Sequence, residues 1–150
     1  MKRATAIKHS DAWNPSEAVD RIVLDADQRH RRRMVLTGEG GTVFLLDLPR
    51  AVMLKDGDGL VLDDASIVRV VGRPESLIEV SATPQELARL AWHIGNRHTD
   101  MQMVDGKLRI RRDPVLEAML LGLGAKLTPL KAPFNPEPGA YAHDGDNHAF

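Results

Sequence analysis

The stretch at 77–130, LIEVSATPQELARLAWHIGNRHTDMQMVDGKLRIRRDPVLEAMLLGLGAKLTPL, decides how the second half of the chain folds. It opens with four residues typical of a strand, LIEV. Thr83 then stands where a helix N-cap is expected, with Pro84 at the first helical position and Glu86 three residues after the cap. Apolar residues follow at the spacing of one helical stripe, at Leu87, Leu90, Ala91 and Ile94.

A hairpin and a second helix follow this first helix. Asp105-Gly106 is typical of a two-residue turn between strands at 101–104 and 107–110, which places Met103 opposite Leu108 and Met101 opposite Ile110 on one face. Asp113-Pro114 favours a new helix start, and Gly124 can end that helix. Its expected apolar stripe is Val115, Leu116, Met119, Leu120 and Leu123. With a last strand at 126–130, the order predicts a ferredoxin-like βαββαβ domain over residues 75–132.

The first half differs, because short strand patterns alternate with Gly-rich and Pro-containing turns. This regular spacing predicts a small β-sandwich or barrel over residues 1–74, so the fold class is α+β. The turns are expected at 38–41, 56–59 and 72–74. DGDG at 56–59 starts like a calcium loop, but the later ligands are missing, so a turn is predicted. Strands are expected at 4–9, 21–25, 32–37, 42–48, 60–62 and 67–71.

Composition excludes several classes of function. The 150 residues have a net charge of -1, contain no cysteine and include only 4% aromatics. Thiolate metal sites are therefore impossible, and a nucleic-acid surface is not expected; the basic run at 29–33 is assigned to a strand edge or a docking patch for an acidic partner. Residues 1–13 have no apolar run typical of a signal peptide, and no stretch is long enough to span a membrane. We expect a cytoplasmic protein with an extended tail at 133–150.

The histidines are the candidate metal ligands of this chain, because neutral imidazole binds nickel, zinc or copper well. His93 and His98 are five residues apart, about 140° around a helix, so one helix does not aim both at one ion. His98 fits either a cation favoured by a helix C-terminus or a ligand. His93 fits a boundary position better than a ligand. His143 and His148 fit either a solvated tail or supplementary ligands. No motif assembles a nucleophile, an acid and a base, so an enzyme is not expected.

Five blocks in this order resemble the UreE family of urease accessory metallochaperones. The resemblance spans nearly the whole chain, and its most characteristic part is the helix that ends in Gly-Asn-Arg-His98. The blocks are LPR followed by LKDGD at 48–58, WHIGNRH at 92–98, LR at 108–109, DPVLE at 113–117 and FNPEPGAY at 134–141.

The resemblance implies a function and a site. It implies a nickel chaperone that delivers Ni(II) to apo-urease, with an N-terminal domain that docks partners and a C-terminal domain that dimerises. His98 from both subunits of a homodimer would be the shared ligand, which a twofold axis permits. Zn(II) or Cu(II) could occupy the same site. The implied partners are the urease-activating GTPase and the apo-urease accessory complex, with no membrane or nucleic acid.

Two departures from the family pattern bear on capacity. Histidines that some members carry after the hairpin correspond here to Arg112 and Pro114, and the tail has only His143 and His148. We therefore expect a small capacity, about one ion per dimer, with affinity falling below about pH 6.5 as imidazoles protonate. The alternative is a non-catalytic interaction adaptor with incidental histidines. A small RNA-binding domain is a third reading, but exposed aromatics on central strands are missing.

Overall fold

The structure is a computed structural model that describes residues 1–138. It is a mixed α+β chain, and the described residues divide into two compact units, Met1–Arg73 with Pro138, and Pro74–Glu137. Among these residues the longest helix has 13 residues, and no helix is long and apolar enough to cross a membrane. Each unit has its own buried apolar cluster, so each is described by itself.

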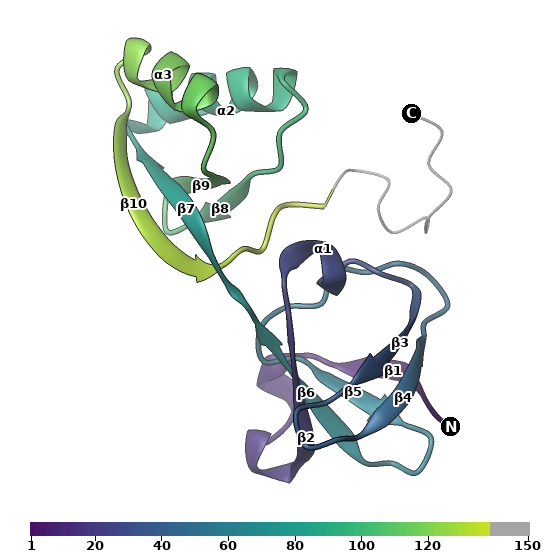
Figure 1. The fold of residues 1–150 in the computed structure, drawn as a ribbon. Helices are drawn as coiled ribbons and strands as arrows, with labels where there is room; N and C mark the ends of the chain where they lie inside the picture. Colours follow the sequence, from purple (N-terminus) through teal and green to yellow (C-terminus); the bar gives the residue numbers. More distant parts are fainter. Residues whose placement is uncertain (139–150) are drawn as a thin grey trace. The chain divides into compact units, whose positions relative to one another are not determined.

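The N-terminal unit is built on strands, where the sequence predicts a small sandwich or barrel. The strands lie in one hydrogen-bonded sheet of order β2-β6-β5-β1-β4-β3, in which β1 pairs with β4 and β2 with β6 in parallel (Figure 1). Phe44, Leu46 and Leu60 are among the fully buried side chains of its core. The elements are β1 (Lys2–Lys8), β2 (Ala18–Leu24), α1 (Ala26–Arg29), β3 (Arg33–Thr37), β4 (Val43–Asp47), β5 (Gly59–Leu62) and β6 (Ile67–Gly72), with 3-10 turns at Ser10–Ala12 and Pro15–Glu17.

The basic run at 29–33 follows the strand-edge expectation at Arg33, the exposed first residue of the edge strand β3, but that expectation is wrong at Arg29. Arg29 ends the short helix α1 instead, and its side chain is fully buried. Its Nε donates to the Leu24 carbonyl at 3.2 Å and its Nη1 to the Leu54 carbonyl at 3.0 Å. A buried guanidinium is tolerated only when its N–H groups are paired, so these bonds make Arg29 a structural residue. The helix was missed because four residues are too few to show a periodicity.

Asp20 organises the turn between β3 and β4. Its carboxylate accepts N–H groups from Arg21, Gly40 and Thr42 at 2.7–3.1 Å. Desolvation acts to raise the pKa of Asp20, but these hydrogen bonds outweigh it and lower the pKa to about 2. A Cβ at Gly38 would lie 2.3 Å from an Asp20 oxygen, so glycine is required there.

Replacing Asp20 with asparagine is expected to lower the free energy of unfolding at pH 7 by about 1–3 kcal/mol, since charged acceptors make strong bonds. Because the folded pKa is depressed, this contribution is present above the unfolded value of about 4 and is lost as the pH falls toward about 2. Thermal unfolding from pH 7 to pH 2 would measure it, with Asp11→Asn as an exposed control. A stability difference between wild type and Asp20→Asn that is constant over this range would contradict the assignment.

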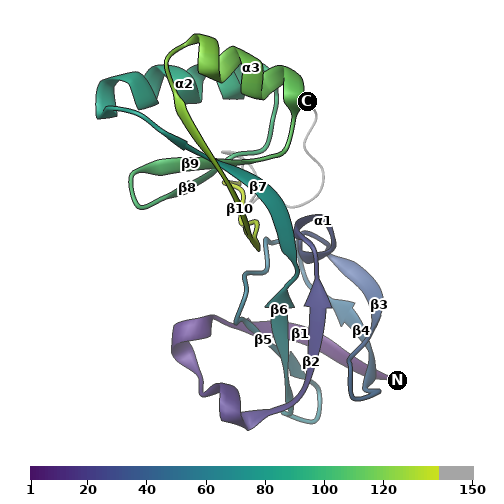
Figure 2. The same cartoon turned by 60° about the vertical axis from the view of Figure 1, so that its left-hand side comes forward.

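The C-terminal unit follows the predicted element order. Its four strands form an antiparallel sheet of order β10-β7-β9-β8, and both helices lie on the same face of that sheet (Figures 1 and 2). Ile78, Leu90 and Leu120 belong to the core between the two layers. The elements are β7 (Pro74–Ser81), α2 (Pro84–Asn96), β8 (Gln102–Val104), β9 (Lys107–Arg111), α3 (Pro114–Gly122) and β10 (Lys126–Pro133).

Local signals set the boundaries of these elements as predicted. The Thr83 side chain accepts the Glu86 N–H at 3.3 Å, and Asp113 accepts two N–H groups at the start of α3. Met103 pairs with Leu108, which confirms the hairpin register. Met103 is nevertheless 56% exposed, because β8 is an edge strand.

The stripe predicted for α3 is wrong at one position. Val115 is 65% exposed, whereas Leu116 and Leu120 are fully buried. A helix with apolar residues on most of its surface does not reveal from periodicity alone which of them face the sheet.

Candidate functional site

His98 lies in the turn that ends α2. The helix stops at Asn96, and the His98 N–H donates to the Gly95 carbonyl at 3.0 Å. The Thr99 N–H donates to the Ile94 carbonyl at 3.5 Å. These two bonds are those of a Schellman motif, in which the residue at the position of His98 adopts the left-handed conformation. His98 is therefore outside the helix.

The backbone of His98 is strained. Its φ is +55°, a region in which glycine is the default residue at this position of a helix end. A side chain in this conformation costs about 1 kcal/mol, although histidine tolerates it better than most residues. His98 is also exposed, so the imidazole projects from the end of the helix and is not part of the core. Packing in the core therefore does not account for a histidine at a position that favours glycine.

His93 has different surroundings. It is half-buried on α2, and its ring lies edge-on to Trp92 with 5.0 Å between ring centroids. The structure records no contact between His93 and His98. Within residues 1–138 no three His, Cys, Asp or Glu side chains come together as a group that could hold a metal ion. His143 and His148 lie outside the described residues.

Arg112 and Pro114, at which the family resemblance would place histidines, have structural roles here. Arg112 forms an ion pair with Glu117, Nη2 to Oε1 at 3.2 Å. Glu117 also accepts the Asp113 N–H at 2.7 Å, and Pro114 is the first residue of α3. This cluster therefore fixes the start of α3.

Apolar side chains are exposed on the two helices. Trp92 of α2 is 63% exposed, and Leu121 of α3 is 58% exposed, like Val115. Trp92 was not among the predicted site residues, although its place outside the stripe of Leu90 and Ile94 indicates that it points away from the core. Exposed large apolar residues of this kind mark interaction surfaces when they gather.

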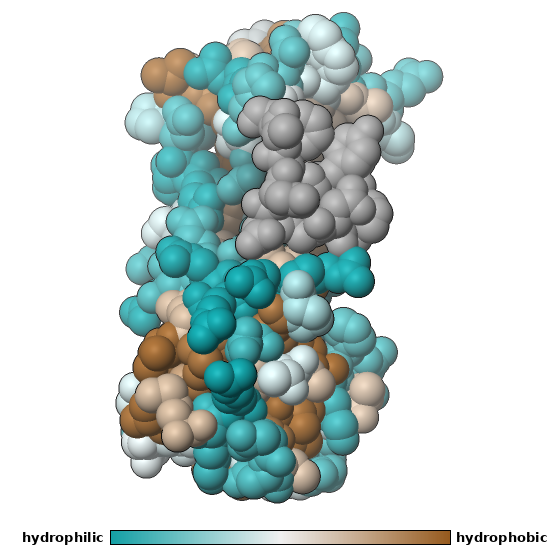
Figure 3. Space-filling model, turned by 90° about the vertical axis from the view of Figure 1, so that its right-hand side faces the viewer, coloured by the Kyte–Doolittle hydropathy of each residue, from teal (hydrophilic) through white to brown (hydrophobic). Residues whose placement is uncertain are grey.

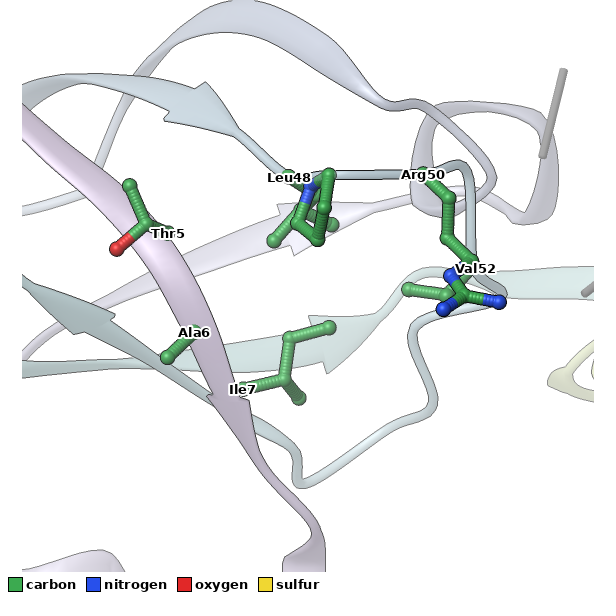
Figure 4. Close-up of a pocket in the computed structure, with 7 residues that line it drawn as sticks. Thr5, Ala6, Ile7, Leu48, Arg50 and Val52 are labelled. Atoms are coloured by element: carbon green, nitrogen blue, oxygen red, sulfur yellow. The ribbon is translucent and has the colours of Figure 1, made fainter.

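The N-terminal unit has a hollow of about 180 Å³ between β1 and the segment at 48–52. Figure 4 shows Ile7, Leu48 and Val52 pointing into this space, with Thr5 and Arg50 at its border. The hollow forms because β1 pairs with β4 only as far as Ala4, and Pro49 follows β4 closely. Apolar side chains also gather on one face of this unit, shown in brown in the lower part of Figure 3.

A second hollow of about 250 Å³ lies beside Arg21 and Arg69, which are register partners on β2 and β6. Arg21 forms an ion pair with Glu39 at 2.6 Å, and Asp20 also lines the hollow. The two cations are thus balanced by two carboxylates, and the hollow has no excess charge to attract an anion.

Comparison with known proteins agrees with this architecture. The family model described as the UreE urease accessory protein, N-terminal domain, matches residues 2–72, and the model of its C-terminal domain matches residues 75–149. A urease accessory protein UreE of Rhodopseudomonas palustris (strain BisB18) is 52% identical over 95% of this chain and 67% of its own length. One of Bradyrhizobium sp. (strain ORS 278) is 49% identical over 99% and 70%.

A more distant relative extends this comparison. The urease accessory protein UreE of Beijerinckia indica is 45% identical over 99% of this chain and 86% of its own length. Matches to both domain models, together with this identity over nearly the whole chain, leave one assignment. The chain belongs to the UreE urease accessory protein family.

Proposed function

We propose that this protein is a nickel-binding metallochaperone that delivers Ni(II) to the urease apoprotein in the cytoplasm, with His98 from two copies as the shared ligands. The observation that carries the proposal is the conformation of His98. An exposed imidazole occupies a left-handed position at φ +55° that would favour glycine. Imidazole is a suitable nickel ligand, and Zn(II) or Cu(II) would compete for it.

A second copy would supply ligands that the described residues of one chain do not bring together. The described residues of one chain bring no three candidate ligands together, so His98 needs ligands from elsewhere. A C2 homodimer places the same residue of both subunits near the axis. The exposed Trp92, Val115 and Leu121 supply apolar area for such an interface. We assign the C-terminal unit to the ferredoxin-like class, because its strand order and its helices on one face fit the predicted βαββαβ arrangement.

The last described residues contact the loop that follows His98. The Glu137 N–H donates to the Met101 carbonyl at 2.7 Å, so the chain leaves the sheet three residues from His98. His143 is the sixth residue after Glu137, and a chain of six residues spans up to about 20 Å. His143 or His148 can therefore complete the coordination of the His98 pair, and His93 is a lower-ranked ligand. Arg112 and Pro114 supply no ligand, which limits the dimer to about one tightly bound ion.

The exposure of the two His98 imidazoles permits nickel to be transferred by ligand exchange. Two imidazoles at an exposed axis leave open coordination positions for water, tail ligands or the residues of an acceptor. Ligands can then be exchanged one at a time, without a covalent step by this chain. We assign docking of the urease-activating GTPase and the apo-urease accessory complex to the N-terminal unit, whose apolar hollow beside Ile7 and Val52 is open to a partner.

A nickel titration of the size-calibrated dimer by calorimetry tests this proposal. We expect a tight step near half an ion per chain at neutral pH. If wild type shows no tight step, or His98→Ala titrates as wild type does, His98 is not the anchor. The adaptor reading would then stand first, with the N-terminal hollow as its supporting observation. Stoichiometric metal binding that depends on His98 separates the two readings.

A further inference from the structure

The face of the C-terminal sheet opposite the helices is crossed by a short segment, residues 134–137. It begins where β10 ends at Pro133 and reaches β8, and these two strands are opposite edges of the sheet (yellow-green after β10 in Figure 1). Phe134 is fully buried in this segment. We refer to residues 134–137 as the strap.

Two backbone groups of the strap are bound to the residues that follow His98. The Asn135 N–H donates to Gln102 Oε1 at 3.0 Å, and the Glu137 N–H donates to the Met101 carbonyl at 2.7 Å. The Gln102 side chain is 9% exposed, so its oxygen needs a partner within the protein. The strap thus holds residues 101–102, the point at which the loop after His98 joins the sheet.

Arg111 adds a third link between the strap and this loop. Its Cζ lies 4.8 Å from the centroid of the Phe134 ring, a cation–π contact. Its Nη1 lies 3.2 Å from Asp100 Oδ2, and its Nε lies 3.2 Å from Glu75 Oε1. Asp100 is two residues after His98 and is exposed, so this ion pair contributes less than the contacts of the buried Phe134 and Gln102.

We infer that Phe134, Gln102 and Arg111 are positioning residues for His98, because the strap fixes the loop that carries it. This inference rests on the proposed function of His98 in metal binding. A non-glycine residue keeps a positive φ only where its surroundings determine the backbone. The strap contacts the loop on the side away from α2 and so supplies part of these surroundings. The strap also ends beside the same loop, at the hydrogen bond from Glu137 to Met101. Without the strap, the loop would have to become ordered when the metal binds. Ordering the backbone of one residue at that step would weaken metal binding about ten-fold.

Gln102→Met in the full-length chain tests the inference, because it keeps an unbranched side chain of similar size but removes the acceptor for Asn135. We expect the tight nickel step to weaken about ten-fold. Gln102→Glu keeps an oxygen that accepts the Asn135 N–H. Its negative charge would lie opposite Arg109 on β9, so we expect wild-type affinity for nickel. Ile78→Val, in the core on the other face of the sheet, is the control for a general loss of stability of about 1 kcal/mol.

A measurement without metal completes the test. The chain has no cysteine, so His98→Cys accepts a single nitroxide label. We expect restricted motion of this label, and faster motion when Gln102→Met is added but not when Ile78→Val is added. Unchanged label motion in Gln102→Met would overturn the strap inference. If the label responds as expected but wild type shows no nickel step dependent on His98, the strap stands and the proposed function fails.

Discussion

Replacing His98 with glycine is expected to stabilise the fold and to abolish tight nickel binding. The backbone at this position has a φ of +55° and makes both hydrogen bonds of a Schellman motif. Glycine adopts this conformation without the steric penalty of a Cβ, and the relief outweighs the greater entropy of glycine in the unfolded chain. The imidazole, which we propose as the shared metal ligand, is lost in the same substitution.

The free energy of unfolding is expected to rise by about 1 kcal/mol. For a domain of the size of the C-terminal unit, this corresponds to a rise of roughly 4–8 °C in the melting temperature. Differential scanning calorimetry of the metal-free protein measures the gain, and a nickel titration measures the loss of the tight step. His98→Ala should lose the same step without the gain, because alanine keeps the strain. The two variants therefore separate the effect on the fold from the effect on the metal.

Ala65→Gly is the matched control. Ala65 has a φ of +73° in a turn of the N-terminal unit, so glycine should also stabilise the protein there without changing nickel binding. If His98→Gly were less stable than wild type, His98 would be a structural residue. If it still bound nickel tightly, the ligand would lie elsewhere, and the observation that carries the proposed function would be lost.

Much of the fold was predictable because its boundaries depend on local chemistry. Thr83 and Asp113 cap the two helices, and Asp105-Gly106 fixes a hairpin in which Asp105 and Gly106 both have positive φ. Such signals act over three or four residues, so a sequence shows them directly.

Features that depend on partners distant in sequence were not predictable. Arg29 is buried because the carbonyl of Leu54, 25 residues away, accepts its Nη1. β10 continues to Pro133, paired with Pro74, although the sequence pattern ended at residue 130. Neither the apolar pattern nor the turn residues contain this information.

The sequence indicates which residue is the candidate ligand, but not the backbone conformation of that residue or its surroundings. The resemblance implies His98 as the shared ligand, whereas without it a histidine at a helix end fits a favourable interaction with the helix dipole. Only the structure shows the left-handed backbone and the contact between Gln102 and Asn135 beside it. A glycine normally stands at this position after a helix, so a histidine there was the available signal.

Replacing Trp92 with aspartate is expected to separate the proposed homodimer. Trp92 is 63% exposed on α2, six residues before His98, and its ring is held edge-on by His93. Tryptophan side chains at the centre of interfaces often contribute about 2 kcal/mol or more, and a charge there must be desolvated. The dissociation constant of the dimer should therefore rise roughly thirty-fold or more, which sedimentation equilibrium measures.

Nickel binding should follow the monomer–dimer equilibrium of this variant. At concentrations where Trp92→Asp is monomeric, each site keeps one His98, and we expect affinity to fall at least ten-fold, the loss that even an indirect partner of a metal ligand produces. Val19→Asp is the matched control, since Val19 is 61% exposed in the N-terminal unit. A monomeric Trp92→Asp that binds nickel as tightly as wild type would show that one chain completes the site, with His143 or His148 in place of the second His98. An unaltered dimer would place the interface away from Trp92.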